Sequence, residues 1–232
     1  FKQMDYTTRE VSGGLIGGLV MALVFSSVFS GVFMIPFGGA TTGSGNYVTE
    51  TYDYSGFSAI EARNGVQVEV IQGDAYSISV KIDDNLLDKL EVSKTDETLK
   101  IMLTPGTFTG VHAVATVTMP GLTKLSLATG AQGRIEDYSA NNIDITVTSG
   151  AHLAMDGEAD DVTLRVTAGS HADLSQFEAA NVDAHFSGGS HGSVYASDRL
   201  DADVSTGSRV SYYGNPDLGR MSVSTGASLN PR

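Results

Sequence analysis

A glycine preceded by a small residue returns at nearly constant intervals through the second half of the chain. The glycines of these steps are Gly130, Gly150, Gly169, Gly189, Gly207 and Gly226. Apolar residues stand five and three positions before each glycine, as in Ile145/Val147, and the residue after it is always small. A unit of about 19 residues cannot bury its own apolar side, but stacked units form a continuous narrow core.

The repeat therefore predicts an all-β fold, a β-solenoid whose coils are about 19 residues long and stack about 4.8 Å apart. We expect each repeating glycine to mark a corner, where a positive φ or a close approach between coils excludes a Cβ atom. A β-sandwich also has short strands at regular spacing, but it does not explain a fixed glycine in every unit. The coils are predicted to occupy residues 122–232.

Residues 50–121 are predicted to form an N-terminal β part of the same domain. Apolar and polar residues alternate around Val66, Val68 and Val70, which is typical of a half-buried strand. Asn64-Gly65 is typical of a type I′ hairpin turn.

A long uncharged stretch precedes this domain. Residues 11–49 contain no charged side chain, and residues 13–37 are apolar enough and long enough for a transmembrane helix. Lys2 and Arg9 precede the helix, whereas the next basic residue is Arg63, so we expect a cytoplasmic segment at 1–12 and a periplasmic or extracellular domain. A secretory signal peptide is the alternative. Residues 38–49, rich in Gly, Ser and Thr, are predicted to be a linker.

Small residues recur every four positions along the predicted helix. They are Gly14, Gly18, Ala22, Ser26 and Ser30. A stripe of small residues allows helix backbones to approach closely in a bilayer. The stripe predicts helix packing against other transmembrane helices or subunits of a membrane complex.

Composition and motifs exclude several functions. The chain has 14 Lys+Arg against 27 Asp+Glu, and this net charge of −13 argues against nucleic acid. The absence of Cys excludes disulfides, thiolate metal sites and cysteine nucleophiles. No phosphate-binding loop or catalytic triad motif is recognisable. We therefore expect no enzyme activity, no cofactor and no small-molecule ligand.

One column of the predicted solenoid carries titratable side chains. Two residues after successive glycines stand His152, His171 and His191, which stacked coils would place side by side. Such a column could bind a metal ion or respond to pH, but we favour an exposed polar ladder with no ligand. Asp183 and Asp201 share another column, for which we favour a solvated face over a Ca²⁺ site.

Several motifs together resemble a known family. They are "FSAIEARNGVQVEVIQGD", "LEVSKTDETLKIML", "VTMPGLTKLSLATGAQGRI", "VTSGAH", "VTAGSH" and "VSTGS". In this order they resemble the head-GIN-domain proteins, the heads of auto-transporter adhesins. The resemblance implies a right-handed β-solenoid that is exported and anchored to a membrane or lipid. It implies no established enzyme activity. Many relatives use a lipid-modified Cys, so this chain would depend on its helix.

Three functions remain open. The stripe of small residues favours a non-enzymatic, membrane-anchored structural or accessory subunit of a membrane assembly. A cell-surface adhesin-like binding protein and a pilin-like filament subunit are the alternatives.

Overall fold

The computed structural model describes residues 40–232, which form one compact unit. The predicted cytoplasmic segment at 1–12 and the predicted transmembrane helix at 13–37, with its stripe of small residues, lie outside the described residues. Within residues 40–232 no helix is long and apolar enough to cross a membrane.

The described chain is almost entirely β. Its elements are β1 (Thr41–Thr42), β2 (Tyr47–Tyr52), β3 (Ala59–Arg63), β4 (Gln67–Gln72), β5 (Ser77–Asp83), the 3₁₀ helix η1 (Asp84–Lys89), β6 (Leu90–Thr95), β7 (Thr98–Leu103), β8 (Phe108–Thr109), β9 (Ala113–Met119), β10 (Lys124–Ala128), β11 (Gln132–Thr148), β12 (His152–Val166), β13 (His171–Phe186), β14 (His191–Val204), β15 (Arg209–Tyr213), β16 (Asp217–Val223) and β17 (Ser228–Pro231).

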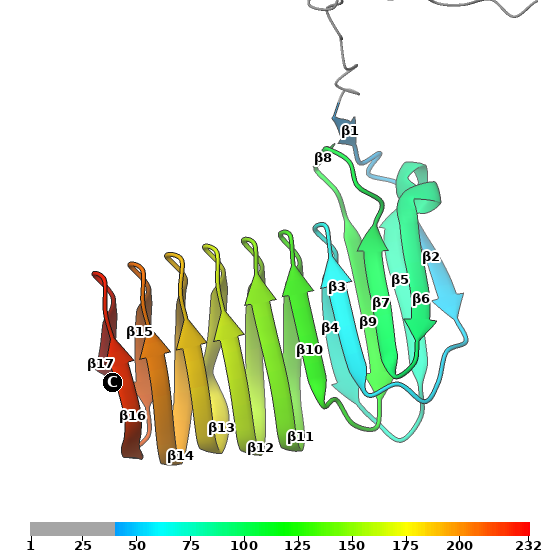
Figure 1. The fold of residues 1–232 in the computed structure, drawn as a ribbon. Coiled ribbons are helices and arrows are strands. Elements are labelled where there is room, and N and C mark those ends of the chain that lie inside the picture. The colour runs from blue at the N-terminus through cyan, green and yellow to red at the C-terminus, as the bar shows by residue number, and fades with distance from the viewer. Residues whose placement is uncertain (1–39) are drawn as a thin grey trace, which may run out of the picture. The chain divides into compact units, whose positions relative to one another are not determined.

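These strands wind into a β-solenoid of about five turns, which confirms the predicted fold class (Figure 1). The first wall contains the strands that enter each corner: β7, β3, β10, the C-terminal parts of β11–β14, and β16. The second wall contains the strands that leave it: β9, β4, the N-terminal parts of β11–β14, β15 and β17. The right-handed sense of the winding stays a prediction.

The core lies between the two walls. Residues of the apolar column three positions before each corner glycine stack in register, and their members Leu127, Val147, Val166, Phe186 and Val204 are fully buried. The small residue after each glycine also points inward, as Ala151 and Ser170 do. The period-two alternation thus separates inward apolar residues from outward polar ones, because successive side chains of a strand point to opposite faces.

Each corner is a two-residue turn with both residues at positive φ. At one of them Ala168 has a φ of 54° and Gly169 a φ of 71°. A Cβ added to Gly169 would meet no atom within 4 Å, and the same holds for the other five repeat glycines. Positive φ, and not close contact between coils, is therefore the reason for the repeating glycine.

The corners are linked to one another by backbone hydrogen bonds. Except at Gly226, the N–H of each corner glycine donates to the carbonyl oxygen of the residue that precedes the glycine in the next coil, as from Gly150 to Ala168 at 3.1 Å and from Gly169 to Gly188 at 3.0 Å. The corners therefore continue the ladders of the two walls without interruption.

Asn64-Gly65 is not a hairpin turn. Both residues have positive φ, and the Gly65 N–H donates to the Thr129 carbonyl at 3.1 Å, as in the other corners. Strands β3 and β4 do not pair with each other, because β3 lies between β7 and β10 whereas β4 lies between β9 and β11. The prediction of a hairpin was wrong because this turn geometry also suits a solenoid corner.

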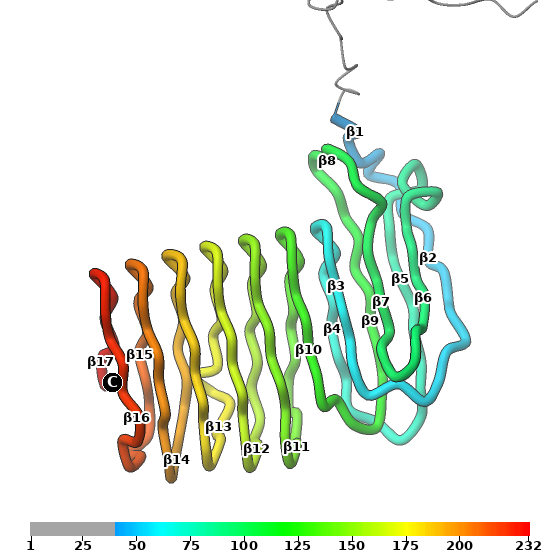
Figure 2. The backbone as a smooth tube through the Cα atoms, viewed as in Figure 1, coloured from blue at the N-terminus to red at the C-terminus, as the bar shows by residue number. Residues whose placement is uncertain are grey.

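The N-terminal end of the solenoid is closed by antiparallel strands. Strands β7 and β9 form a coil beyond β3 and β4, although they follow them in sequence. Strand β6 pairs antiparallel with β7, β5 with β9, and β2 with β5. The tube view shows these strands grouped at one end, with the repeat coils extending away from them (Figure 2).

Residues 40–49, expected to belong to a linker, are part of the folded unit. Strand β1 pairs with β8, and β2 begins at Tyr47. The buried Asp83 carboxylate accepts hydrogen bonds from the Gly45 N–H and the His112 N–H, both at 2.8 Å. Asn85 donates to the Thr42 carbonyl at 2.9 Å. Polar side chains far along the chain thus hold a segment whose composition alone indicates flexibility.

A substitution at a corner glycine tests this account of the repeat. Gly169→Ala should lower the free energy of unfolding by about 1–2 kcal/mol, because an L residue with a side chain is strained at positive φ. Gly169→Asn should lose less, since Asn tolerates this region better. Urea unfolding followed by circular dichroism measures both.

Gly157→Ala serves as a comparison in which the added side chain also clashes with the backbone. A Cβ atom at position 157 would lie 2.0 Å from the Tyr138 carbonyl oxygen. It should lose more stability than Gly169→Ala. Equal stability of Gly169→Ala and the wild type would contradict the proposed role of positive φ.

Candidate functional site

The three histidines lie side by side on the outer surface of the second wall. His152 is in register with His171, and His171 with His191. The ring centroids of His152 and His171 are 6.2 Å apart. Gln132 precedes the histidine column and Arg209 continues it, with the Arg209 guanidinium 3.3 Å from His191 Nε2.

The middle histidine has an altered proton affinity. Partial burial by its neighbours lowers the pKa of His171 below its ordinary value of 6.5, and the adjacent His152 and His191 lower it further. The Asp173 carboxylate, two residues along the same strand, acts in the opposite direction. The net result is a His171 imidazole that stays neutral to a lower pH than a free histidine.

Asp173 is held as a carboxylate beside this column. Burial opposes its ionisation, but hydrogen bonds from the Ser193 hydroxyl and from Ser175 outweigh burial and lower the pKa of Asp173. The Ser175 N–H donates to Asp173 Oδ1 at 3.0 Å, and the Ser193 hydroxyl donates to the same oxygen. A fixed negative charge therefore lies next to His171.

The histidine column brings three potential metal ligands to one face of the second wall. Residues 40–232 contain no group of three or more His, Cys, Asp or Glu side chains placed to hold a metal ion. The Arg209 guanidinium beside His191 also disfavours a cation there. The arrangement offers an exposed polar stripe for contacts.

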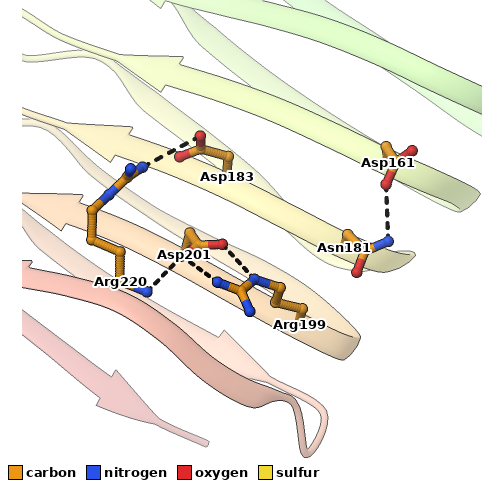
Figure 3. A network of polar contacts seen from close by, with 6 residues as sticks. All are labelled: Asp161, Asn181, Asp183, Arg199, Asp201 and Arg220. Carbon is orange, nitrogen blue, oxygen red and sulfur yellow. Dashed lines mark hydrogen bonds and ion pairs between the residues drawn. The ribbon is translucent and has the colours of Figure 1, made fainter.

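The aspartate column lies on the outer surface of the first wall and is paired with arginines (Figure 3). Arg199 donates to both carboxylate oxygens of Asp201, at 2.7 and 3.1 Å. The Arg220 guanidinium lies 3.6 Å from Asp183 Oδ2, and the Arg220 N–H donates to Asp201 at 2.5 Å. The bond from Arg199, followed by that from the Arg220 backbone, lowers the pKa of Asp201. These partners occupy the oxygens that a Ca²⁺ ion would need.

On the same wall, His185 Nδ1 lies 3.5 Å from Asp203 Oδ2 in the next coil.

The last coil differs from the coils that the repeat describes. Five and three positions before Gly226 stand Met221 and Val223, the counterparts of the buried pairs in the inner coils, yet Val223 is 47% exposed and Met221 only partly buried. Leu218 on the same strand is 53% exposed. The reason is that no strand of residues 40–232 stacks beyond β16 and β17.

The pKa of His171 provides a test of the column's electrostatics. Asp173→Asn should lower the pKa of His171 further, because the carboxylate that raises it is removed. An NMR titration of the histidine ring resonances measures this shift. Asp203→Asn, on the other wall, is the control and should leave His171 unchanged; an unchanged pKa in Asp173→Asn would refute the assigned interaction.

The same shift predicts a dependence of stability on pH. Because the folded state lowers the pKa of His171, its neutral form contributes stability above the unfolded pKa of about 6.5, and this contribution is lost as pH falls below that value and through the lower pKa of the folded state. Urea unfolding between pH 8 and 5 should therefore show a smaller loss for His171→Gln than for the wild type. Identical pH profiles would show that His171 does not contribute.

Comparison with solved structures finds the same fold in several bacterial proteins. A protein from Bacteroides fragilis described as a "putative adhesin" has a TM-score of 0.68 at 17% identity, with 83% of this chain and 100% of that chain covered. A "putative lipid binding protein" from Parabacteroides distasonis has a TM-score of 0.53 at 19% identity, with 83% and 99% covered. A "putative adhesin" from the same species has a TM-score of 0.50 at 13% identity, with 83% and 100% covered.

At such identities the likeness shows the fold alone. No curated protein matches the sequence. The family model described as "Putative auto-transporter adhesin, head GIN domain" matches residues 56–216, from the first coil to the beginning of the last. The expected resemblance is thereby confirmed, and the chain belongs to the head GIN domain family.

Proposed function

We propose that this protein is a non-enzymatic, adhesin-like binding protein that displays its β-solenoid outside the cytoplasm. The observation that carries the proposal is the regular outer surface of the solenoid, where polar side chains of successive coils align in columns such as His152, His171 and His191. A surface of this kind favours extended contact with a partner over conversion of a substrate held in a pocket.

The family and its relatives support the same class of function. The family description names an adhesin head, and the Bacteroides fragilis protein of the same fold is described as a "putative adhesin". This support is for adhesin-like binding in general. The chemistry of the partner has to be inferred from this chain's own surface.

Attachment to a membrane is part of the proposal. Residues 13–37 form an uncharged apolar segment long enough to cross a bilayer, and basic residues precede it at Lys2 and Arg9. We propose a single-pass anchor with a cytoplasmic N-terminus and an exported solenoid. The segment would also place the small-residue stripe, from Gly14 to Ser30, within the lipid bilayer.

The adhesin-like function replaces the subunit of a membrane assembly as the preferred interpretation. The stripe of small residues remains the sole argument for a subunit, and a stripe of this kind also occurs in isolated membrane helices. A pilin-like filament has no support from the relatives of the same fold.

Cells that produce the full chain provide the test. On intact cells the solenoid should be cleaved by added protease, and the cells should attach to at least one of mucin, matrix protein or neighbouring cells several-fold more than cells without the protein. Val166→Asp is the matched control: Val166 is fully buried, and a buried unpaired charge should unfold the coils while the N-terminal segment is retained.

Protection of the solenoid from protease on intact cells would contradict the proposed location. Attachment that is equal in the wild type and Val166→Asp would contradict a role for the folded solenoid.

A further inference from the structure

A hollow lies at the edge of the solenoid opposite the glycine corners. There residues 120–123, which carry the chain from β9 in the second wall to β10 in the first, lie beside the middle of β11 (Figure 1). The hollow has a volume of about 370 Å³, which is within the range of small-molecule sites. Its polar side chains are Gln72, Thr123, Ser139, Asn141 and Asn142, and its apolar ones are Pro120, Leu122 and Ala140. We call it the amide hollow.

The amide hollow differs in charge from other hollows of residues 40–232. Four of these, among them the one lined by Arg134, Glu136, Asp156 and Asp173, each contain four charged side chains. The amide hollow contains none, although charged residues make up 18% of the full chain. An ion therefore finds no partner of opposite charge in its walls, and an anion must also approach a chain with a net charge of −13. The hollow suits an uncharged ligand.

Side-chain hydrogen bonds fix the walls of the amide hollow. The Gln72 amide donates to the Ser139 carbonyl at 3.0 Å and accepts from the Ser139 N–H at 2.9 Å. The same amide donates to the Pro120 carbonyl at 3.4 Å. In addition, the hydroxyl of the buried Tyr138 accepts from the Leu122 N–H. These bonds join residues 120–123 to β11, so the hollow is formed before a ligand arrives and little ordering is left for the binding step.

Two amide side chains of the hollow remain free to bind. Asn141 and Asn142 are exposed, and neither side chain forms a hydrogen bond within residues 40–232. Each amide has a carbonyl oxygen that accepts and an NH₂ group that donates. A hydroxyl group also donates and accepts, so a ligand with several neighbouring hydroxyls would use both ends of both amides.

A peptide strand is less suited to this place. Peptides add to a sheet through unpaired backbone N–H and C=O groups at a strand edge. At Ser139 both backbone groups on the side of the hollow are already bonded to Gln72, and the other side of β11 is paired with β12. The hollow therefore offers side-chain amides and a proline ring in place of a backbone edge.

We propose that the amide hollow binds an uncharged sugar residue of a glycan. The ring hydroxyls would exchange hydrogen bonds with Asn141 and Asn142, while the apolar C–H face of the sugar would pack against Pro120. This inference rests on the proposed function, because it names the class of partner that the adhesin-like solenoid holds. A single open site of this kind binds weakly, so attachment of a cell would use many copies at once.

Binding of the full chain to immobilised glycans tests the proposal. The chain, held in lipid nanodiscs without sugar-based detergent, is applied to neutral oligosaccharides that end in galactose, N-acetylgalactosamine, glucose or mannose, and to their sialylated and sulfated counterparts. We expect binding to at least one neutral glycan, with no gain from the acidic groups. Asn141→Ala/Asn142→Ala should weaken this binding at least about tenfold, because two hydrogen-bonding side chains are lost.

Asn215→Ala/Asn230→Ala is the matched control. Both residues are exposed, lie outside the amide hollow and likewise form no side-chain hydrogen bond within the described part of the chain. This variant should bind like the wild type, and urea unfolding should give the same midpoint for both double variants. Preference for the acidic glycans, binding to no neutral glycan, or equal binding by the wild type and Asn141→Ala/Asn142→Ala would overturn the inference.

Attachment of cells separates this inference from the proposed function. If cells that produce the wild-type chain attach to mucin, matrix protein or neighbouring cells, and Asn141→Ala/Asn142→Ala attaches equally well, the adhesin-like function stands while the inference fails. If the purified chain binds a neutral glycan through the two asparagines but the cells do not attach, the inference stands while the proposed function fails.

Discussion

The structure depends on the parallel, in-register hydrogen bonding between one coil and the next. Each coil contributes few apolar residues, and its narrow core is closed only when neighbours cover it on both sides. The ladder continues through the corners, where the Gly150 and Gly169 N–H groups donate to the next coil. Positive φ at two successive corner residues keeps these donors and acceptors aligned, and glycine meets this requirement at the second position.

The same stacking determines what the surface can do. Residues 19 or 20 positions apart in sequence become neighbours, so His152, His171 and His191 form a column without any tertiary contact specific to them. Neighbouring side chains then modify one another: partial burial in the column, with a smaller effect of the two flanking histidines, lowers the pKa of His171, whereas the Asp173 carboxylate opposes the change. On the other wall, arginines neutralise the column of aspartates.

The two ends of the stack have opposite properties. Antiparallel strands close the first coil, while the last coil leaves Leu218 and Val223 exposed. An end that is open in this way has the same backbone edge and apolar core that join the inner coils.

The sequence alone determined the coil length, the inward apolar columns, the position of the corners and the alignment of the histidines. It could do so because these features follow from a local repeat and from the period of a strand. The repeat did not separate positive φ from close packing as the reason for glycine. It also extended the inward pattern to Val223, which is exposed because no further coil within residues 40–232 covers it.

Tertiary structure decided the features that depend on contacts between distant segments. Asn64-Gly65 forms a corner because β3 pairs with β7 and β4 pairs with β9, both of which come later in the chain. Strands β3 and β4 therefore do not pair with each other as a hairpin. Gly45 is ordered because Asp83 accepts its N–H. The pKa of His171 depends on side chains of two other coils. The stacking of β7 and β9 beside β3 and β4 and the hydrogen bond from Gly45 to Asp83 do not repeat with the coil, so the repeat carries no record of them, and only the folded chain brings their partners together.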